Sequence, residues 1–328
     1  MSEWPTFTLS SRAKIPAVGL GTYFGDDMKL PQDQINNLVE TAVRAGYRHF
    51  DGALVYGNGS QIGIALARVF DMGLVKREDI FYTCKCPETM LTAPNVRKAL
   101  EQTLESLQLD YLDLYLLHWP VCFYPSNPPI NLEDMWKVME DLYAEGKVRA
   151  IGVSNYTVEM LKKLLTYTGT SAEPPFISMP LSTVHPSTLL MKFSMYESHP
   201  YLPQPALLSF CHSRSIHVTA YSPLGAGKSD PPVLLSDTFV TALASTHAAP
   251  RRKGCSVTPR TQSVGRAVEN FARVKGVVRE VVREVVRKVE TRKRYVDPRV
   301  FWRVDVFGEG GLGEGEGEGD GASAVPKK

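Results

Sequence analysis

Between residues 47 and 168, short apolar runs alternate with segments whose apolar residues recur at helical spacing. The runs at 47–53, 80–86, 111–120 and 148–155 are each followed by a segment of helix length. Strands that alternate with helices through short connections form right-handed βαβ units and a parallel sheet. Further strands are predicted at 217–225 and 254–260, and 7–21 is predicted to form a hairpin that leads into a first strand. With seven of eight strands recognisable, the pattern predicts a (β/α)8 TIM barrel, and an open doubly wound sheet is the alternative.

Three segments interrupt this alternation, so an incomplete barrel is expected around its sixth strand and its last helices. Residues 174–198 have no clean period, 245–257 leave no room for a packed helix, and a VVRE repeat follows residue 276. We predict one barrel domain over 1–307, irregular at 174–195 and 245–253 and with an atypical helix at 276–294. The Gly/Glu-rich segment 308–328 is predicted to be disordered.

The composition favours a soluble enzyme: of 328 residues 43% are hydrophobic and 22% charged, with a net charge of +2. This balance gives no reason to expect nucleic acid or a membrane as partner, and we expect a monomer. The segment 251–303 is basic, and its Arg and Glu neighbours favour a solvated helix face over a membrane or nucleic-acid surface. No signal peptide or membrane-spanning run is evident. Five cysteines without paired spacing suit a reducing cytosol, so a cytoplasmic location is expected.

Lys85 stands in the middle of an apolar strand pattern, "IFYTCKC". Lysine is almost never fully buried without a partner, because desolvating an ammonium is costly. Cys84 and Cys86 share the opposite strand face, but no second cysteine cluster supports a zinc site, so we expect no metal. A redox function of these thiols stays a distant alternative.

Active sites of parallel barrels lie at the C-terminal ends of the strands. The predicted strand ends carry Asp51 with Tyr56 shortly after it, then Lys85 and then His118. A lysine ammonium beside a phenol stabilises phenolate, and an aspartate holds that lysine charged. This set predicts reduction of a carbonyl, with Tyr56 as proton donor, Asp51 as the partner of Lys85, and His118 as the residue that orients the carbonyl. The hydride must come from a cofactor.

With these residues in place, the chain resembles the aldo-keto reductases. The motifs that carry the resemblance are "DGALVYGN", the Lys85 strand, "YLDLYLLHWP", "GKVRAIGVSN", "HPYLPQ", "AYSPLG" and "RYVDPRVFWRVDVFGE". The style is closest to fungal members that reduce small aldehydes or act as glycerol dehydrogenases. The family implies a barrel that binds NADPH without a Rossmann domain, and a catalytic tetrad of Asp51, Tyr56, Lys85 and His118.

The same resemblance implies a set of binding residues. Ser154 and Asn155 would hold the nicotinamide carboxamide, Tyr221 would stack under the ring, and Ser222 and Leu224 would line the pyrophosphate. Around the adenosine, the implied contacts are Arg260, Thr261 and Arg266 to the 2′-phosphate and Glu269 and Asn270 to the adenine. Cationic side chains beside that phosphate favour NADP over NAD. The implied substrate pocket consists of Tyr23, Trp119, Tyr124 and Trp302.

One substitution departs from the family pattern on the cofactor side. The glutamine expected before "YESHPYLPQ" is Met195, which cannot replace its hydrogen bonds. An alternative therefore stays open: a barrel without catalysis that acts by binding or interaction.

Overall fold

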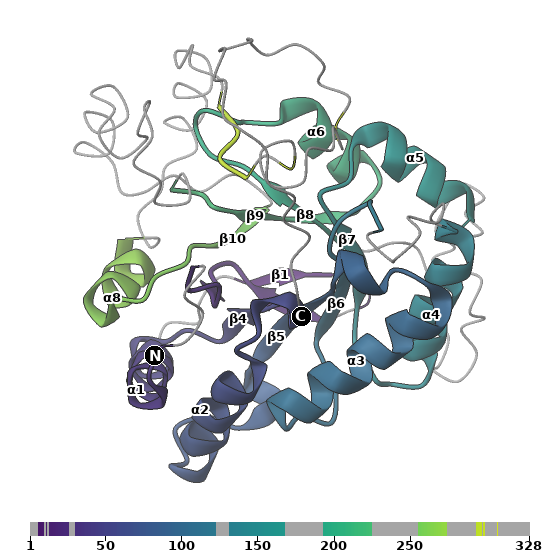
Figure 1. Cartoon of the computed structure of the whole chain (residues 1–328). Coiled ribbons are helices and arrows are strands. Elements are labelled where there is room, and N and C mark those ends of the chain that lie inside the picture. Colours follow the sequence, from purple (N-terminus) through teal and green to yellow (C-terminus); the bar gives the residue numbers. More distant parts are fainter. Residues whose placement is uncertain are drawn as a thin grey trace, which may run out of the picture. The chain divides into compact units, whose positions relative to one another are not determined.

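A computed structural model describes residues 6–9, 11, 13–25, 30–122, 131–167, 193–224, 255–273, 293–296, 298 and 307. The chain divides after Val296 into a large unit and a short C-terminal unit. Within the large unit, eight parallel strands pair in the order β10-β9-β8-β7-β6-β5-β4-β3 (Figure 1). Parallel bridges from Val18 to Val257 and from Gly21 to Arg260 join the two edges of this sheet. The predicted (β/α)8 barrel is confirmed.

The strands lie where the alternating pattern predicts them, apart from small shifts at their ends. The barrel strands are β3 (Leu20–Gly21), β4 (His49–Asp51), β5 (Phe81–Cys86), β6 (Leu114–Leu117), β7 (Ile151–Ser154), β8 (Phe193–Glu197), β9 (His217–Tyr221) and β10 (Cys255–Thr258). The expectation of an incomplete barrel around the sixth strand was wrong, because β8 is present and pairs with both β7 and β9. Its sequence, "FSMYE", is buried on both faces like that of β5, and it was not recognised because it ends the segment 174–198, which has no clean period.

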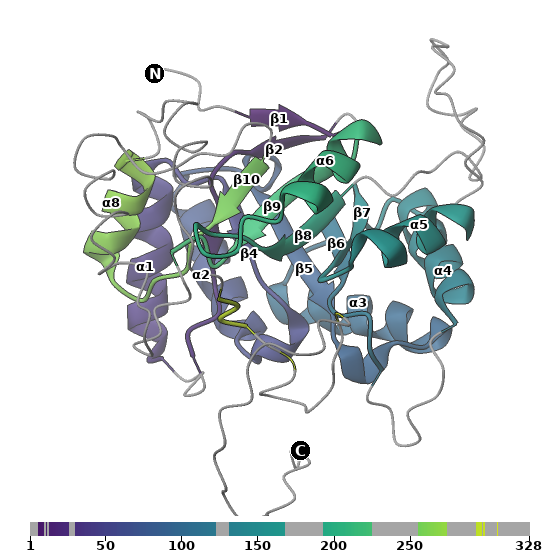
Figure 2. The same cartoon turned by 90° about the horizontal axis from the view of Figure 1, so that it is seen from above.

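Helices cover the outside of the strands within this unit. They are α1 (Gln32–Ala45), α2 (Gly59–Asp71), α3 (Ala93–Leu107), α4 (Leu132–Ala144), α5 (Val158–Tyr167), α6 (Pro205–Ser213) and α8 (Val264–Arg273). Figure 2 shows α1 to α5 following one another around the outside of the strands, with α8 beside α1. Gly46 ends α1 in the left-handed conformation (φ 109°) and donates to the carbonyls of Ala42 and Val43, a common helix ending that favours glycine.

Apolar side chains form two clusters, one on each side of the barrel strands. The larger one lies between strands and helices and includes Tyr47, Trp136 and Leu164. The smaller one fills the barrel interior and joins Leu9 and Ile15 to strand residues such as Phe81 and Phe193. Leu9 and Ile15 come from the predicted hairpin, which is formed by β1 (Thr6–Thr8) and β2 (Lys14–Pro16). Because Phe81 and Phe193 begin their strands, the hairpin closes the N-terminal end of the barrel and leaves the C-terminal end for a site.

Several predicted segments lie wholly or mostly outside the described residues. They are 174–192 of the irregular sixth-strand region, 245–253, most of the VVRE helix at 276–294, and the tail at 308–328. Among the residues that are described, no helix is long and apolar enough to cross a membrane.

Candidate active site

Lys85 and Asp51 form a buried ion pair at the C-terminal ends of β5 and β4. Lys85 Nζ donates to Asp51 Oδ1 and to the carbonyl of Gly52, both at 2.7 Å. The side chains of Lys85 and Asp51 are 2% and 6% exposed. The fold therefore pairs the buried Lys85 with Asp51, the partner that the sequence predicted.

The charges of this pair are set by burial and by their mutual attraction. Burial raises the pKa of Asp51, and the Lys85 ammonium opposes that rise. For Lys85, burial alone would lower the pKa, but the nearby Asp51 carboxylate and Tyr56 raise it above its usual value. The proton accordingly stays on the lysine, and the pair presents an ammonium to its neighbours.

Tyr56 lies directly beside the ammonium of Lys85. It is the last residue of the 3-10 helix η1 (Leu54–Tyr56), which follows β4 after a short turn. Lys85 Nζ is 5.2 Å from the centre of the Tyr56 ring. Burial raises the pKa of Tyr56 above 10, while the Lys85 charge opposes that rise. The phenol therefore keeps its proton at neutral pH and has a cation beside it that stabilises phenolate.

The turn between β4 and η1 is fixed by close packing at Gly52. A Cβ on Gly52 would lie 2.7 Å from Tyr82 Oη, so a larger residue does not fit. Beside it, Asn58 Nδ2 donates to the carbonyl of Thr22 at 2.7 Å, and Thr22 Oγ1 donates to the carbonyl of Asp51 at 3.0 Å. These bonds hold Asp51 and the following turn against the first barrel strand.

His118 faces Tyr56 from the segment that follows β6. The two ring centres are 6.0 Å apart in an edge-to-face arrangement. Burial, together with the charge of Lys85, lowers the pKa of His118 well below 6.5. The imidazole is therefore neutral at neutral pH, the form in which one ring nitrogen donates and the other accepts a hydrogen bond. Four predicted tetrad residues thus come together at one end of the barrel.

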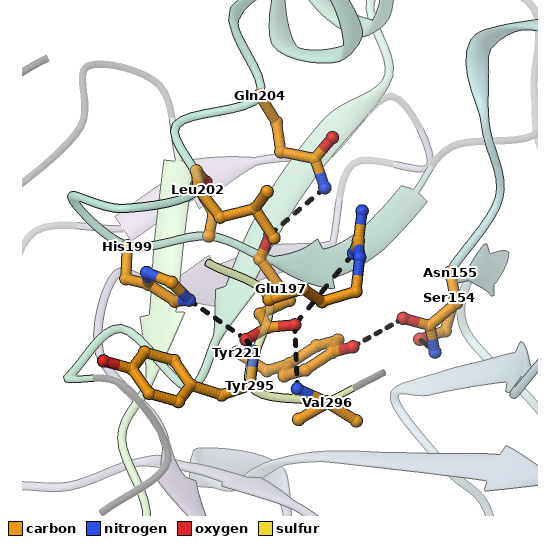
Figure 3. A network of polar contacts seen from close by, with 11 residues as sticks. Ser154, Asn155, Glu197, His199, Leu202, Gln204, Tyr221, Tyr295 and Val296 are labelled. Carbon is orange, nitrogen blue, oxygen red and sulfur yellow. Dashed lines mark hydrogen bonds and ion pairs between the residues drawn. The ribbon is translucent and has the colours of Figure 1, made fainter. Parts of the chain in front are cut away.

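Asn155 connects three strand ends on the predicted cofactor side, and Figure 3 shows it beside Ser154 and Tyr221. Its Nδ2 donates to the carbonyl of His118 at 3.0 Å and to Ser154 Oγ at 3.2 Å, and its Oδ1 accepts from Tyr221 Oη at 2.7 Å. Its backbone is left-handed (φ 66°), a conformation in which asparagine is enriched. Ser154, Asn155 and Tyr221 therefore form one bonded group beside His118. Ser222, also left-handed (φ 48°), and half-buried Leu224 follow Tyr221.

Met195 occupies the position at which the family resemblance places a glutamine. It is 1% exposed and belongs to the apolar cluster of the barrel interior, against which Tyr221 packs. Its backbone carbonyl still accepts from Asn155 N at 2.8 Å. The substitution thus removes a polar side chain and leaves the backbone support of Asn155 in place.

The remaining predicted cofactor residues lie on the turn after β10 and on α8. Arg260 is exposed, and its guanidinium lies 5.2 Å from the Tyr23 ring centre. Thr261 Oγ1 accepts from Ser263 N at 3.0 Å. Arg266 and Glu269 are exposed and Asn270 is half-buried.

Two of the four predicted pocket residues lie beside the tetrad. The ring of Tyr23 is centred 5.2 Å from that of Tyr56, and the ring of Trp119 is centred 6.2 Å from that of His118. Tyr124 and Trp302 lie outside the described residues.

The cysteines beside Lys85 face away from this site. Cys84 and Cys86 pack in the cluster between strands and helices, as the strand alternation predicts. Burial raises the pKa of Cys84 to about 11 and that of Cys86 to about 12, so both are thiols at neutral pH. Within the part of the chain that the structure describes, no group of three or more His, Cys, Asp and Glu could hold a metal ion.

Two buried carboxyl groups near the site were not predicted. Glu88 follows β5 and is 6% exposed, and Glu197 ends β8 and is fully buried. Glu197 holds the segment 293–296: its carboxylate accepts from Tyr295 N at 2.7 Å, Val296 N at 3.1 Å and His199 Nε2 at 3.0 Å (Figure 3). Arg294 Nη1 lies 4.0 Å from the same carboxylate. Glu88 and Glu197 both lie at C-terminal strand ends, and this position is the signal by which the sequence could have indicated them.

Comparison with known proteins agrees with this geometry. The family model described as "Aldo/keto reductase family" matches residues 17–281. Aldose reductase B of Dictyostelium discoideum is 37% identical over 284 residues, which cover 78% of this chain and 83% of that protein. Aldo-keto reductase family 4 member C11 of Arabidopsis thaliana is 38% identical over 286 residues, covering 81% and 82% of the two chains.

A solved structure shares the architecture over nearly its whole length. The crystal structure of a Bombyx mori aldo-keto reductase in complex with NADP superimposes with a TM-score of 0.74 at 28% identity, covering 92% of this chain and 97% of that one. With a family model that matches most of the sequence, relatives above one third identity and a shared barrel, this chain belongs to the aldo/keto reductase family.

Proposed function

We propose that this chain reduces a small aldehyde or ketone to the alcohol, or catalyses the reverse oxidation, with NADPH as cofactor. The observation that carries the proposal is the buried Lys85–Asp51 pair beside the Tyr56 ring. A structural ion pair does not require a phenol and a neutral imidazole at the same place. An ion pair, a phenol and a neutral imidazole at the C-terminal end of a barrel match the needs of carbonyl reduction.

The residues on the cofactor side fit NADPH. Ser154 and Asn155 offer hydroxyl and amide groups to a carboxamide, and the Tyr221 ring offers a flat surface for stacking. Arg260 and Arg266 are exposed cations on one turn and the following helix, which suits a 2′-phosphate. When bound, the cofactor supplies the hydride that no side chain carries.

In this proposal each tetrad residue has a separate role. Tyr56 gives its phenolic proton to the carbonyl oxygen, and the Lys85 ammonium stabilises the phenolate that forms. Asp51 keeps Lys85 charged and in position. His118, as a neutral imidazole, donates to the carbonyl oxygen and orients it. Tyr23 and Trp119 provide apolar surface around the substrate. Such a surface favours an uncharged aldehyde over a highly charged one.

Replacement of Tyr56 by phenylalanine tests the assignment of the proton donor. Tyr56→Phe removes the donated proton and leaves the ring, so we expect kcat to fall by about 10²–10⁴-fold and NADPH binding to persist. Aldehyde-dependent NADPH oxidation measures the first, and quenching of tryptophan fluorescence on titration with NADPH measures the second. Tyr167→Phe, at an exposed position on α5, is the matched control. Full turnover in Tyr56→Phe would contradict the assignment.

The same titration separates the reductase from a barrel without catalysis. Met195 is the observation that favours the second function, because it removes an expected polar contact to the cofactor. Saturable NADPH binding at micromolar concentration or tighter supports the reductase. A folded protein that does not bind NADPH would contradict it and leave a binding role.

A further inference from the structure

Glu88 carries a buried carboxyl group that the proposed reaction does not use. It begins the 3-10 helix η3 (Glu88–Met90), directly after Pro87 and β5. The residue is 6% exposed, and its Oε2 is buried without a hydrogen-bond partner among the described residues. Carboxylates are almost never buried in this way unless they are paired, so the position calls for a partner.

The nearest candidate is the unused nitrogen of His118. Glu88 Oε2 lies 3.9 Å from His118 Nδ1, and Nδ1 is likewise buried without a hydrogen-bond partner among the described residues. Two unsatisfied polar atoms thus face each other behind the proposed carbonyl-binding group. The distance exceeds a hydrogen bond, so a bond between the two atoms requires the Glu88 side chain to move toward the ring. Bonds of catalytic groups are often long before substrate binds.

The protonation of the two groups decides the direction of that bond. Burial raises the pKa of Glu88, although its own backbone amide opposes the rise. Burial and Lys85 lower the pKa of His118. Both groups are thus biased toward their neutral forms, in which a carboxylic acid has one O–H donor and an imidazole has one acceptor nitrogen.

We propose that Glu88 is a positioning residue that donates a hydrogen bond from its carboxyl group to Nδ1 of His118 and thereby keeps the proton of His118 on Nε2. This proposal rests on the function proposed above. The hydrogen bond at one ring nitrogen determines which nitrogen carries the proton. Nε2–H then points its proton at the substrate, as an orienting donor must.

Ionisation of Glu88 would reverse the arrangement. A carboxylate accepts, so His118 would place its proton on Nδ1 and would turn a lone pair toward the carbonyl oxygen. Among the described residues, the titratable groups beside the pair are Lys85 and Cys86 on β5 and Tyr56 on η1, and Asp51 is bound to Lys85. Lys85, Cys86 and Tyr56 each have a pKa raised above an already alkaline ordinary value. Ionisation of Asp51 gives the form that the proposed reaction needs, so a fall of kcat/KM with rising pH, below the pH at which the other three groups titrate, reports Glu88.

Nitrogen NMR of the full-length protein, labelled with ¹⁵N-histidine, measures the tautomer directly. The His118 signal is assigned by its loss in His118→Gln. In the unsubstituted protein we expect Nε2–H at low pH and a change toward Nδ1–H as the pH rises. In Glu88→Gln the amide donates at every pH, so Nε2–H should persist throughout. Glu88→Leu, which has no donor, should give a mixture of tautomers. Glu101→Gln, exposed on α3, is the control.

Kinetics provide the second measurement. Glu88→Leu should lower kcat by about 10- to 100-fold with a smaller change in KM, because the bond is needed most in the transition state. Glu88→Gln should restore kcat relative to Glu88→Leu and should remove the fall of kcat/KM that Glu88 ionisation causes.

If the His118 tautomer of Glu88→Gln changed with pH as it does in the unsubstituted protein, and the two pH profiles were the same, the proposal would be overturned, even if Glu88→Leu fails to fold. The NMR readout does not depend on turnover. An inactive protein with the expected tautomers would therefore contradict only the proposed function, whereas an active protein without them would contradict only the role of Glu88.

Discussion

The two ends of the barrel bury histidines beside different partners. At the N-terminal end, His49 Nε2 lies 3.0 Å from Thr83 Oγ1, and His217 Nε2 lies 3.0 Å from Ser256 Oγ. At the C-terminal end, His199 is paired with Glu197, and Glu88 Oε2 lies 3.9 Å from His118 Nδ1. Hydroxyl groups satisfy a neutral ring without charge, whereas carboxyl groups can exchange a proton with it or stabilise its charge.

The difference separates a structural end from a chemical one. The N-terminal end is closed by the hairpin, and Phe7 and Phe193 lie against His217 with ring centres 4.9 and 5.6 Å away. Burial lowers the pKa of His49 to about 3 and that of His217 to about 4. The C-terminal end instead holds the ammonium of Lys85 between the carboxyl group of Asp51 and the phenol ring of Tyr56. In TIM barrels the C-terminal end carries the chemistry and the other end stability.

The largest expected effect comes from removing the charge of Lys85. Lys85→Met leaves Asp51 buried without its cation, so the free energy of unfolding should fall by about 3–5 kcal/mol. Turnover should fall by at least about 10² because phenolate loses its stabilising charge. Urea unfolding and aldehyde-dependent NADPH oxidation measure the two effects. Lys98→Met, exposed on α3, should change neither. A fully active Lys85→Met would remove the chemical distinction between the two ends.

A smaller loss of stability is expected from replacing Glu197, which binds the 293–296 segment at the same end of the barrel. Glu197→Leu removes the acceptor of Tyr295 N and Val296 N, so the free energy of unfolding should fall by about 1–3 kcal/mol. Hydrogen exchange of those two amides should become faster, which mass spectrometry of the 293–296 segment detects. Glu159→Leu, exposed on α5, is the control. Unchanged exchange would show that Glu197 does not hold this segment.

The smallest expected effect is a change in how the free energy of unfolding depends on pH, caused by His217 at the N-terminal end. Because the pKa of His217 in the fold, about 4, lies below its unfolded value, the unfolded chain binds the proton first. The stabilisation is complete above about pH 6.5 and is lost as the pH falls toward 4. His217→Gln should therefore lose less stability than the unsubstituted protein between pH 6 and 5, by about 1.4 kcal/mol per pH unit at most. Urea unfolding at the two pH values measures this, and equal slopes would refute it.

The sequence predicted the barrel because local patterns repeat in it. Helical stripes such as that of 96–107, joined by short loops to apolar strands, leave few topologies. It also predicted that Lys85 needs a partner, and Asp51 was the carboxylate at the neighbouring strand end. The strand at 193–197 was missed because it ends the segment 174–198, whose sequence has no clean period to mark where a strand begins.

By itself, the sequence determined the fold class, the strand ends that carry Asp51, Tyr56, Lys85 and His118, and the outward direction of Cys84 and Cys86. Periodicity and desolvation cost are local properties, so residues near one another in sequence suffice to read them. Only the tertiary structure decided that Glu88 lies opposite His118 Nδ1 and that Glu197 holds Tyr295 and Val296, almost one hundred residues away. Such contacts depend on the distance and orientation of side chains from different strand ends, which no local pattern records.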